Sequence, residues 1–126
     1  MQPEKQFQLK VEEFFKSNWI YPCGRLRKKR NGWYVKIWGG GFQRVGIPDI
    51  LACIKGVFVA VELKSPRGKP SALQILNIDN IRESGGMAYI LYPKDFEVFK
   101  NEILALISGD LQELPLQVSS EIQGKS

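Results

Sequence analysis

The sequence predicts one α/β domain built around a mixed sheet, and three observations predict it. Apolar residues recur at helical spacing in three segments, and short apolar runs of strand length lie between these segments. Two of the runs form a hairpin, so they are antiparallel, whereas a later run follows a helix, and such a crossover joins parallel strands. At 126 residues the chain is long enough to bury one core. The expected order is α-β-β-β-α-β with a closing C-terminal helix.

The first helix is expected over residues 4–18. Its apolar stripe is formed by Phe7, Val11, Phe14 and Phe15. A strand over residues 33–38 alternates bulky and polar side chains, and the three glycines that follow it end it.

The next two strands, about residues 49–54 and 57–64, form a hairpin that turns at Lys55 and Gly56. Both are apolar on both faces, which is typical of the centre of a covered sheet. Residues equally distant from the turn face each other across a hairpin, so Asp49 is expected opposite Glu62.

The second half of the chain supplies the crossover. Ser71 is a suitable N-cap for a helix that runs to Ser84, where two glycines end it. A strand is expected over residues 87–92 and a closing helix over residues 95–108. The folded domain is therefore expected to span residues 1–109, and residues 110–126 form a tail that docks or frays.

The amino-acid composition excludes several kinds of catalytic and metal-binding site. The chain contains no histidine, which excludes serine–histidine triads, histidine-ligated zinc and histidine general bases. Its two cysteines, Cys23 and Cys53, indicate neither a disulfide framework nor a thiolate cluster. We find no secretion signal and no apolar run of membrane-spanning length, so a soluble cytoplasmic protein without an organic cofactor is expected.

Positive charge is concentrated in the first half. Residues 1–69 contain fourteen Lys and Arg against five Asp and Glu, whereas residues 70–126 contain four against eight. This asymmetry favours a polyanionic partner, with a solvated basic surface as the alternative.

The opposed carboxylates of Asp49 and Glu62 carry the functional prediction. Directly opposed residues have Cβ atoms roughly 4.5–5.5 Å apart, and like charges at that distance are destabilising, so a cation between them is expected. Lys64 projects from the same face as Glu62. Two acids and an ammonium group on a buried strand face indicate a metal-dependent site for phosphodiester cleavage. A turn cap at Asp49 and an edge-strand ion pair of Glu62 with Lys64 are the structural alternatives.

The element order, an aspartate that opens the second strand and Glu-x-Lys at the end of the third resemble the PD-(D/E)xK nuclease superfamily. Four further segments resemble the VRR-NUC family, particularly its small stand-alone phage and bacterial members. These are Gly46-Ile47-Pro48-Asp49, Val61-Glu62-Leu63-Lys64, Gly68-Lys69-Pro70-Ser71 with Gln74, and Gly85-Gly86-Met87-Ala88. The resemblance covers roughly residues 4–100.

This resemblance implies hydrolysis of nucleic-acid phosphodiesters with Mg²⁺ or Mn²⁺. The ion would be held by Asp49, Glu62 and the backbone carbonyl of Leu63, which are hard oxygen ligands. Lys64 would orient or deprotonate the attacking water, or neutralise charge on the phosphate. The setting it implies is the cytoplasm of a bacterium or of a phage-infected cell.

Members of the superfamily commonly add an acid from the first helix, and Glu4, Glu12 and Glu13 are candidates. With Phe7 at zero and 100° per residue, Glu4 lies at about 60°, within the apolar stripe. Glu12 lies at about 140°, on its border, and Glu13 faces solvent. We therefore favour Glu4, with Glu12 as the alternative and a simple helix-dipole role as the structural explanation.

Gln74 shares a helix face with Ile78 and Ile81, so its amide points inward. It is a candidate partner for a catalytic carboxylate, a metal-bound water or the phosphate, and burial against a loop carbonyl is the alternative. Lys36 and Gln43 flank the glycine loop that leads to Asp49, and both are candidates for contact with the phosphate backbone, with a solvated strand face as the alternative for Lys36.

A basic run followed by Trp33 and Tyr34 is the best candidate for nucleic-acid binding, because guanidinium groups bind phosphates and aromatic rings stack on unpaired bases. Lys69 and Arg67 would extend it to the rim of the site, and a solvated loop is the alternative for each single residue. The run consists of Arg25, Arg27, Lys28, Lys29 and Arg30.

The sequence thus predicts a metal-dependent endonuclease for branched, Holliday-junction-like or duplex DNA that pairs with itself as a two-fold dimer. The alternatives are a nucleic-acid-binding subunit without catalysis, an RNA-cleaving enzyme and a restriction-type enzyme of the same fold.

Overall fold

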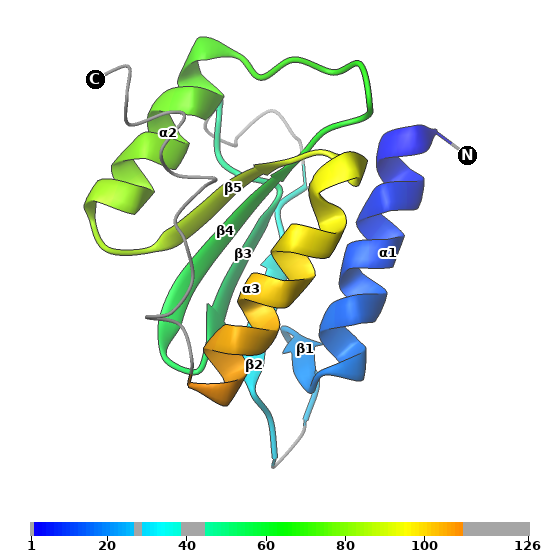
Figure 1. Cartoon of the computed structure of the whole chain (residues 1–126), viewed down its shortest axis with the longest axis vertical. Helices are drawn as coiled ribbons and strands as arrows, with labels where there is room; N and C mark the ends of the chain where they lie inside the picture. The colour runs from blue at the N-terminus through cyan, green and yellow to red at the C-terminus, as the bar shows by residue number, and fades with distance from the viewer. Residues whose placement is uncertain (1, 27–28, 39–44, 110–126) are drawn as a thin grey trace.

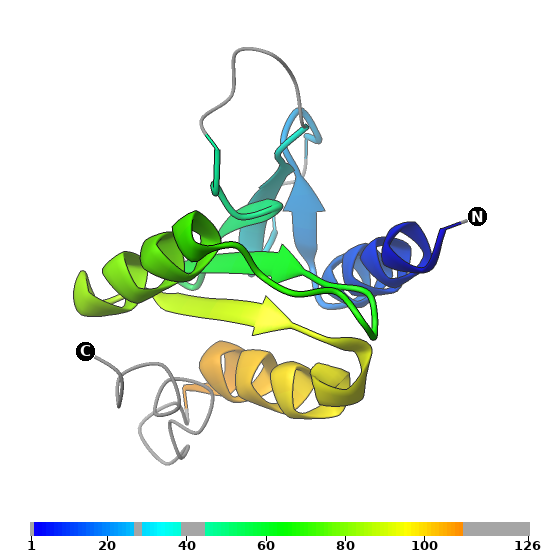
Figure 2. The same ribbon diagram turned by 90° about the horizontal axis from the view of Figure 1, so that it is seen from above.

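The computed structural model describes residues 2–26, 29–38 and 45–109. A mixed five-stranded sheet forms the centre of the domain, with α1 and α3 on one face and α2 on the other (Figures 1 and 2). The strands lie in the order β1-β2-β3-β4-β5. Their bounds are Ile20–Pro22 for β1, Gly32–Lys36 for β2, Ile50–Ile54 for β3, Val57–Leu63 for β4 and Met87–Leu91 for β5.

All three predicted helices are confirmed, with ends that move by one or two residues. Helix α1 spans Pro3–Ser17, helix α2 spans Ala72–Glu83, and helix α3 spans Phe96–Ser108 after a short 3-10 turn, Pro93–Asp95. Ser71 caps α2 as predicted, since its side chain accepts a hydrogen bond from the backbone of Gln74. The described chain therefore has the predicted α/β class and the closing helix.

The predicted order lacked one strand, β1. This three-residue edge strand pairs in parallel with β2, and Tyr21 lies beside Trp33. The sequence analysis gave the segment no strand because three residues are too few to establish an alternating pattern. The basic run begins after β1, in the connection to β2, which agrees with an exposed turn at a sheet edge.

The hairpin of β3 and β4 has the predicted turn and register. Lys55 and Gly56 both have positive φ, 49° and 82°, as a two-residue type I′ turn requires. Ile50 faces Val61, and Ile54 faces Val57. One residue further from the turn, the same register carries Asp49 toward Glu62.

The two faces of the sheet are covered unequally. The larger core joins α1 and α3 to one face through residues such as Phe15, Val59 and Phe99. On the other face α2 packs on β4 and β5, where Ala60, Ile78 and Ala88 are buried. The hairpin was predicted to be covered on both faces, but Phe58 and Cys53 are exposed, because α2 reaches only part of this face. Among the described residues, we find no helix with the length and apolar character needed to span a membrane.

Candidate active site

Asp49 is positioned by the segment that precedes β3. Gly46 has a φ of 87° and lies so close to Leu73 of α2 that a Cβ atom there would meet it at 2.9 Å. Asn77 of α2 donates a 2.9 Å hydrogen bond to the carbonyl of Gly46. The backbone carbonyl of Asp49 accepts a 2.7 Å hydrogen bond from Ile37. The segment is therefore fixed to α2 on one side and to the end of β2 on the other.

The carboxylate of Asp49 joins three elements. Its Oδ2 accepts a 2.8 Å hydrogen bond from the backbone N–H of Leu63 in β4. Its Oδ1 lies 3.7 Å from Nζ of Lys36, which comes from β2. Because the N–H and C=O groups of a residue in an antiparallel ladder face the same neighbour, the carbonyl of Leu63 also faces the Asp49 side.

Glu62 is buried at the centre of the site, with 4% of its surface exposed. Oε2 accepts a 2.9 Å hydrogen bond from Nε2 of Gln74 and lies 3.6 Å from Nζ of Lys64. Oε1 is also buried, and it has no hydrogen-bond partner. One carboxylate oxygen is therefore fully engaged while the other is left for a donor or a cation, and leaving a buried carboxylate oxygen unsatisfied is costly.

The environment of Glu62 raises its pKa to about 8. Burial is the largest cause, and the negative charge of Asp49 is the second. The ammonium of Lys64 opposes this shift, and Glu4 adds to it weakly. Two carboxylates in one partly buried space resist joint ionisation, and a cation between them would remove that resistance.

Lys64 follows β4 and is largely buried beside the carboxylates. Its backbone N–H donates a 2.9 Å hydrogen bond to the carbonyl of Leu91 in β5, which continues the parallel pairing by one residue. The side chain of Lys64 is 12% exposed, and its ammonium faces Glu62. The lysine is therefore held by the centre of the sheet and not by a loop.

The side-chain amide of Gln74 makes two hydrogen bonds, one in the N-terminal cap of α2 and one at the site. Its Oε1 accepts a 2.8 Å hydrogen bond from the backbone N–H of Ser71, completing a capping box, while Nε2 donates to Glu62. The sequence analysis considered several partners for the Gln74 amide, and in the structure its NH₂ group contacts the carboxylate of Glu62. The capping box fixes the orientation of the amide, so Gln74 presents its NH₂ group to Glu62.

Two acids of α1 have different surroundings. Glu12 accepts hydrogen bonds from the hydroxyl of Tyr34 at 2.8 Å and from Nε2 of Gln8 at 2.6 Å. This contact, after burial, raises the pKa of Tyr34. Glu4 is exposed, and its charge acts on Glu62. Glu12 therefore has a structural role on the face of the sheet that α1 and α3 cover, and Glu4 is the acid of α1 that influences the site.

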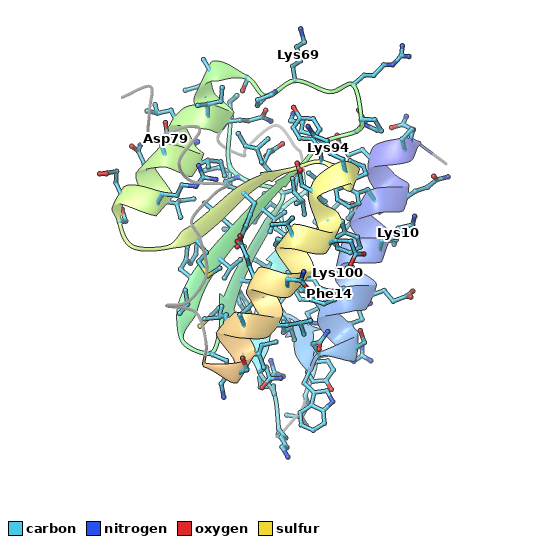
Figure 3. All side chains as sticks on the ribbon, in the orientation of Figure 1. Lys10, Phe14, Lys69, Asp79, Lys94 and Lys100 are labelled. Carbon is cyan, nitrogen blue, oxygen red and sulfur yellow. The ribbon has the colours of Figure 1, made fainter. Side chains whose placement is uncertain are left out.

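The predicted basic residues are distributed over three places. Lys36 lies at the site, where its Nζ also donates a 3.1 Å hydrogen bond to the carbonyl of Ile37. Arg67 and Lys69 are exposed in the loop between β4 and α2, and Figure 3 shows Lys69 extending away from the domain. At the β1 edge lie Arg25, Lys29 and Arg30. Three further candidates, Arg27, Lys28 and Gln43, lie outside the described residues.

The sequence analysis missed Asn77, which holds the Gly46 carbonyl, and Tyr92, whose hydroxyl donates a 2.9 Å hydrogen bond to the carbonyl of Gly68 in the loop after Lys64. It also missed Trp38, whose ring lies near the ammonium groups of Lys5 at 5.3 Å and Lys36 at 5.6 Å. Only the position of Asn77, one turn after Gln74 on α2, gave a signal that could have identified it.

The residues at the site fit a hard divalent cation. Within residues 2–26, 29–38 and 45–109, no three Asp, Glu, His or Cys side chains are grouped closely enough to hold a metal ion by themselves. The set here is two carboxylates and a backbone carbonyl, and Mg²⁺ commonly binds one or two carboxylates and keeps several waters. The unpartnered Oε1 of Glu62 is the observation that supports this fit.

Comparisons of the chain with protein-family models, with curated proteins and with solved structures gave no match.

Proposed function

We propose that this protein is a metal-dependent endonuclease with a PD-(D/E)xK core of the VRR-NUC type, which hydrolyses DNA phosphodiester bonds. The observation that carries the proposal is the buried carboxylate of Glu62, which lies against Asp49 with one oxygen unpartnered. A purely structural carboxylate in this position would be expected to have its oxygens satisfied. The unequal use of the two oxygens favours a site prepared for a cation.

The bound ion would polarise a phosphate oxygen and make a coordinated water more acidic. The ligands from this chain would be Asp49, Glu62 and the carbonyl of Leu63. Gln74 would keep Oε2 of Glu62 in place by its hydrogen bond, which leaves Oε1 available as a ligand. Lys64 would sit beside them as an ammonium that neutralises charge on the phosphate or as a base for the attacking water.

Lys36 would act at Oδ1 of Asp49, the carboxylate oxygen that does not bind the N–H of Leu63. Its Nζ lies 3.7 Å from Oδ1, so it pairs with that carboxylate and would add a second positive charge where the phosphate binds. The exposed Arg67 and Lys69 would extend the positive surface along the nucleic acid.

The proposed substrate is branched or Holliday-junction-like DNA, and the proposed active form is a two-fold dimer. Two copies related by a two-fold axis would present two sites to opposite strands. Support for shape recognition comes from the basic run at the β1 edge, which is suited to phosphates and not to base edges.

The test incubates purified protein with a labelled four-way junction, a flap, a duplex, a single strand and RNA, each with Mg²⁺, with Mn²⁺ or with EDTA. Wild-type protein is expected to cut the junction with either metal, and Asp49→Ala is expected to be inactive. Equal inactivity of both proteins on every substrate would exclude the endonuclease. Metal-independent binding without cutting would support a nucleic-acid-binding subunit instead, and cleavage confined to RNA would change the substrate class.

A further inference from the structure

A row of aromatic residues crosses the face of the sheet that carries Asp49 and Glu62. Tyr21 of β1 lies beside Trp33 of β2, Trp33 faces Cys53 of β3, and Cys53 faces Phe58 of β4. Neighbours in register project from the same face of a sheet. We refer to Tyr21, Trp33, Cys53 and Phe58 as the aromatic row.

Three of the four residues of the aromatic row are exposed to solvent, and Tyr21 is half-buried. Trp33 is 43% exposed and Phe58 is 45% exposed, and Cys53 is also exposed. Helix α2 covers the same face over β4 and β5, where Ala60 and Ala88 are buried (Figure 2). A contiguous exposed apolar surface on a domain marks a binding site more often than isolated exposed residues do.

Positive charge borders the row at the β1 edge. The guanidinium of Arg30 lies 5.7 Å from the centre of the Tyr21 ring, and the ammonium of Lys29 lies 4.8 Å from that of Trp19. Arg30 also donates a 2.8 Å hydrogen bond to the carbonyl of Arg25, so these basic residues are held together. Cations beside exposed aromatic rings are suited to a ligand that carries both phosphates and flat bases.

The row continues toward the carboxylates. Alternate residues of β3 and β4 share one face, so Cys53 and Leu51 lead to Asp49 as Phe58 and Ala60 lead to Glu62. At about 3.3 Å per residue, the separation of four positions along each strand between the row and the carboxylates spans roughly 13 Å. Helix α2 buries Ala60 on β4, whereas Leu51 and Val35 of β2, which lies beside Leu51 on the same face, are only half-buried, so a strand bound on the row can approach the carboxylates along β2 and β3.

We infer that the aromatic row is a stacking platform for unpaired bases, which holds a single-stranded segment of nucleic acid beside the carboxylate site. Base stacking on Trp33 and Phe58 provides affinity without sequence preference, and the basic residues at the β1 edge bind the backbone. This inference rests on the proposed function, which supplies nucleic acid as the ligand. It concerns the binding of that ligand and not its cleavage. It predicts that the enzyme selects substrates with an unpaired segment next to the cleaved bond.

The first test uses Cys53 as a reporter within the row. In a Cys23→Ser protein, Cys53 is the single thiol, and its alkylation by a maleimide is followed in EDTA, so that no cleavage occurs. A deoxythymidine oligonucleotide is expected to slow alkylation at least fivefold, and a fully paired duplex is expected to have little effect. Equal protection by single strand and duplex, or protection by neither, would overturn the inference. Protection that grows with protein concentration in the absence of DNA would also overturn it, since a second copy would then cover the row.

The second test separates stacking from charge. Trp33→Ala and Phe58→Ala are each expected to weaken single-strand binding at least fivefold, with unchanged dependence on salt. Arg30→Ala is expected to weaken binding and to reduce the salt slope by about one. Leu104→Ala, at an equally exposed apolar residue of α3, is the matched control. Thermal unfolding verifies that each variant is folded, and normal binding by folded Trp33→Ala and Phe58→Ala would overturn the inference.

The two proposals fail in different ways. Cleavage of the junction with no protection of Cys53 would remove the platform and keep the endonuclease. Protection and weakened binding without cleavage on any substrate would support the platform on a binding subunit and remove the endonuclease.

Discussion

Nε2 of Gln74 donates a hydrogen bond of 2.9 Å to Oε2 of Glu62, and this bond joins the start of α2 to the end of β4. The same amide completes the cap of α2 through its Oε1. The geometry of the carboxylate and the start of the helix therefore depend on one side chain. Substitutions at position 74 that keep only one of the two contacts can separate the effect of the cap from the effect of the contact with Glu62.

Gln74→Ala is expected to lose both contacts, lowering the free energy of unfolding by about 1 to 3 kcal/mol in metal-free protein. Gln74→Glu keeps an acceptor for the Ser71 N–H, as capping boxes allow, but places a carboxylate against Glu62 in place of a donor. It is expected to be destabilised at pH 8 and nearly normal at pH 5. Urea unfolding at the two pH values measures both effects. A Glu variant as stable as wild type at pH 8 would show that the contact with Glu62 contributes little.

The raised pKa of Glu62 predicts an unusual dependence of stability on pH. Its folded-state pKa of about 8 lies above the ordinary value of 4.5, so the folded protein binds the proton more tightly than the unfolded chain. This contribution is fully present below about pH 4.5 and is lost as the pH rises to about 8, with a size on the order of a few kcal/mol. Urea unfolding of metal-free protein from pH 5 to pH 9 is the measurement.

Glu62→Gln is the control for this pH dependence. The difference in unfolding free energy between wild type and this variant isolates the contribution of Glu62 from that of other ionisable groups. The variant is expected to gain relative stability as the pH rises. A difference that stays constant from pH 5 to pH 9 would mean that Glu62 has an ordinary pKa.

The sequence predicted those parts of the site that local pattern determines. The Lys55-Gly56 turn fixed the hairpin register, and this register brings Asp49 and Glu62 together because the hydrogen-bonded ladder allows no other pairing once the turn is set. Ser71 could be identified as the N-cap because capping depends on residues within one turn.

Long-range relationships could not be predicted in the same way. That Asn77 holds the Gly46 carbonyl depends on how α2 packs on the segment before β3, which no local pattern encodes. The helical angle placed Glu4 and Glu12 near the same apolar stripe, but it could not show that Glu12 reaches Tyr34. The exposure of Trp33 and Phe58 was also unpredictable, since alternation identifies a face and not what covers it.

Glu62→Gln is expected to abolish cleavage while it retains or tightens DNA binding. The substitution would remove a proposed metal ligand and, above about pH 8, one negative charge, yet it preserves the shape of the side chain. Fluorescence anisotropy with a labelled junction in EDTA measures binding, and gel analysis with Mg²⁺ measures cleavage. Loss of binding in the folded variant would contradict the ligand role, because a ligand for the cation should not be needed for metal-free contact with phosphates.

The two acids of α1 are expected to respond differently to substitution. Glu12→Ala removes the acceptor for Tyr34 and Gln8, so it should lower the free energy of unfolding by about 1 to 3 kcal/mol. Glu4→Ala should leave stability nearly unchanged, because Glu4 is exposed, but should weaken the stabilisation of the protein by Mn²⁺. Thermal unfolding over a Mn²⁺ titration measures both effects. Glu13→Ala, at another exposed acid of α1, is the matched control and should change neither. If Glu12→Ala and not Glu4→Ala weakened the response to Mn²⁺, then Glu12 would be the acid that α1 supplies.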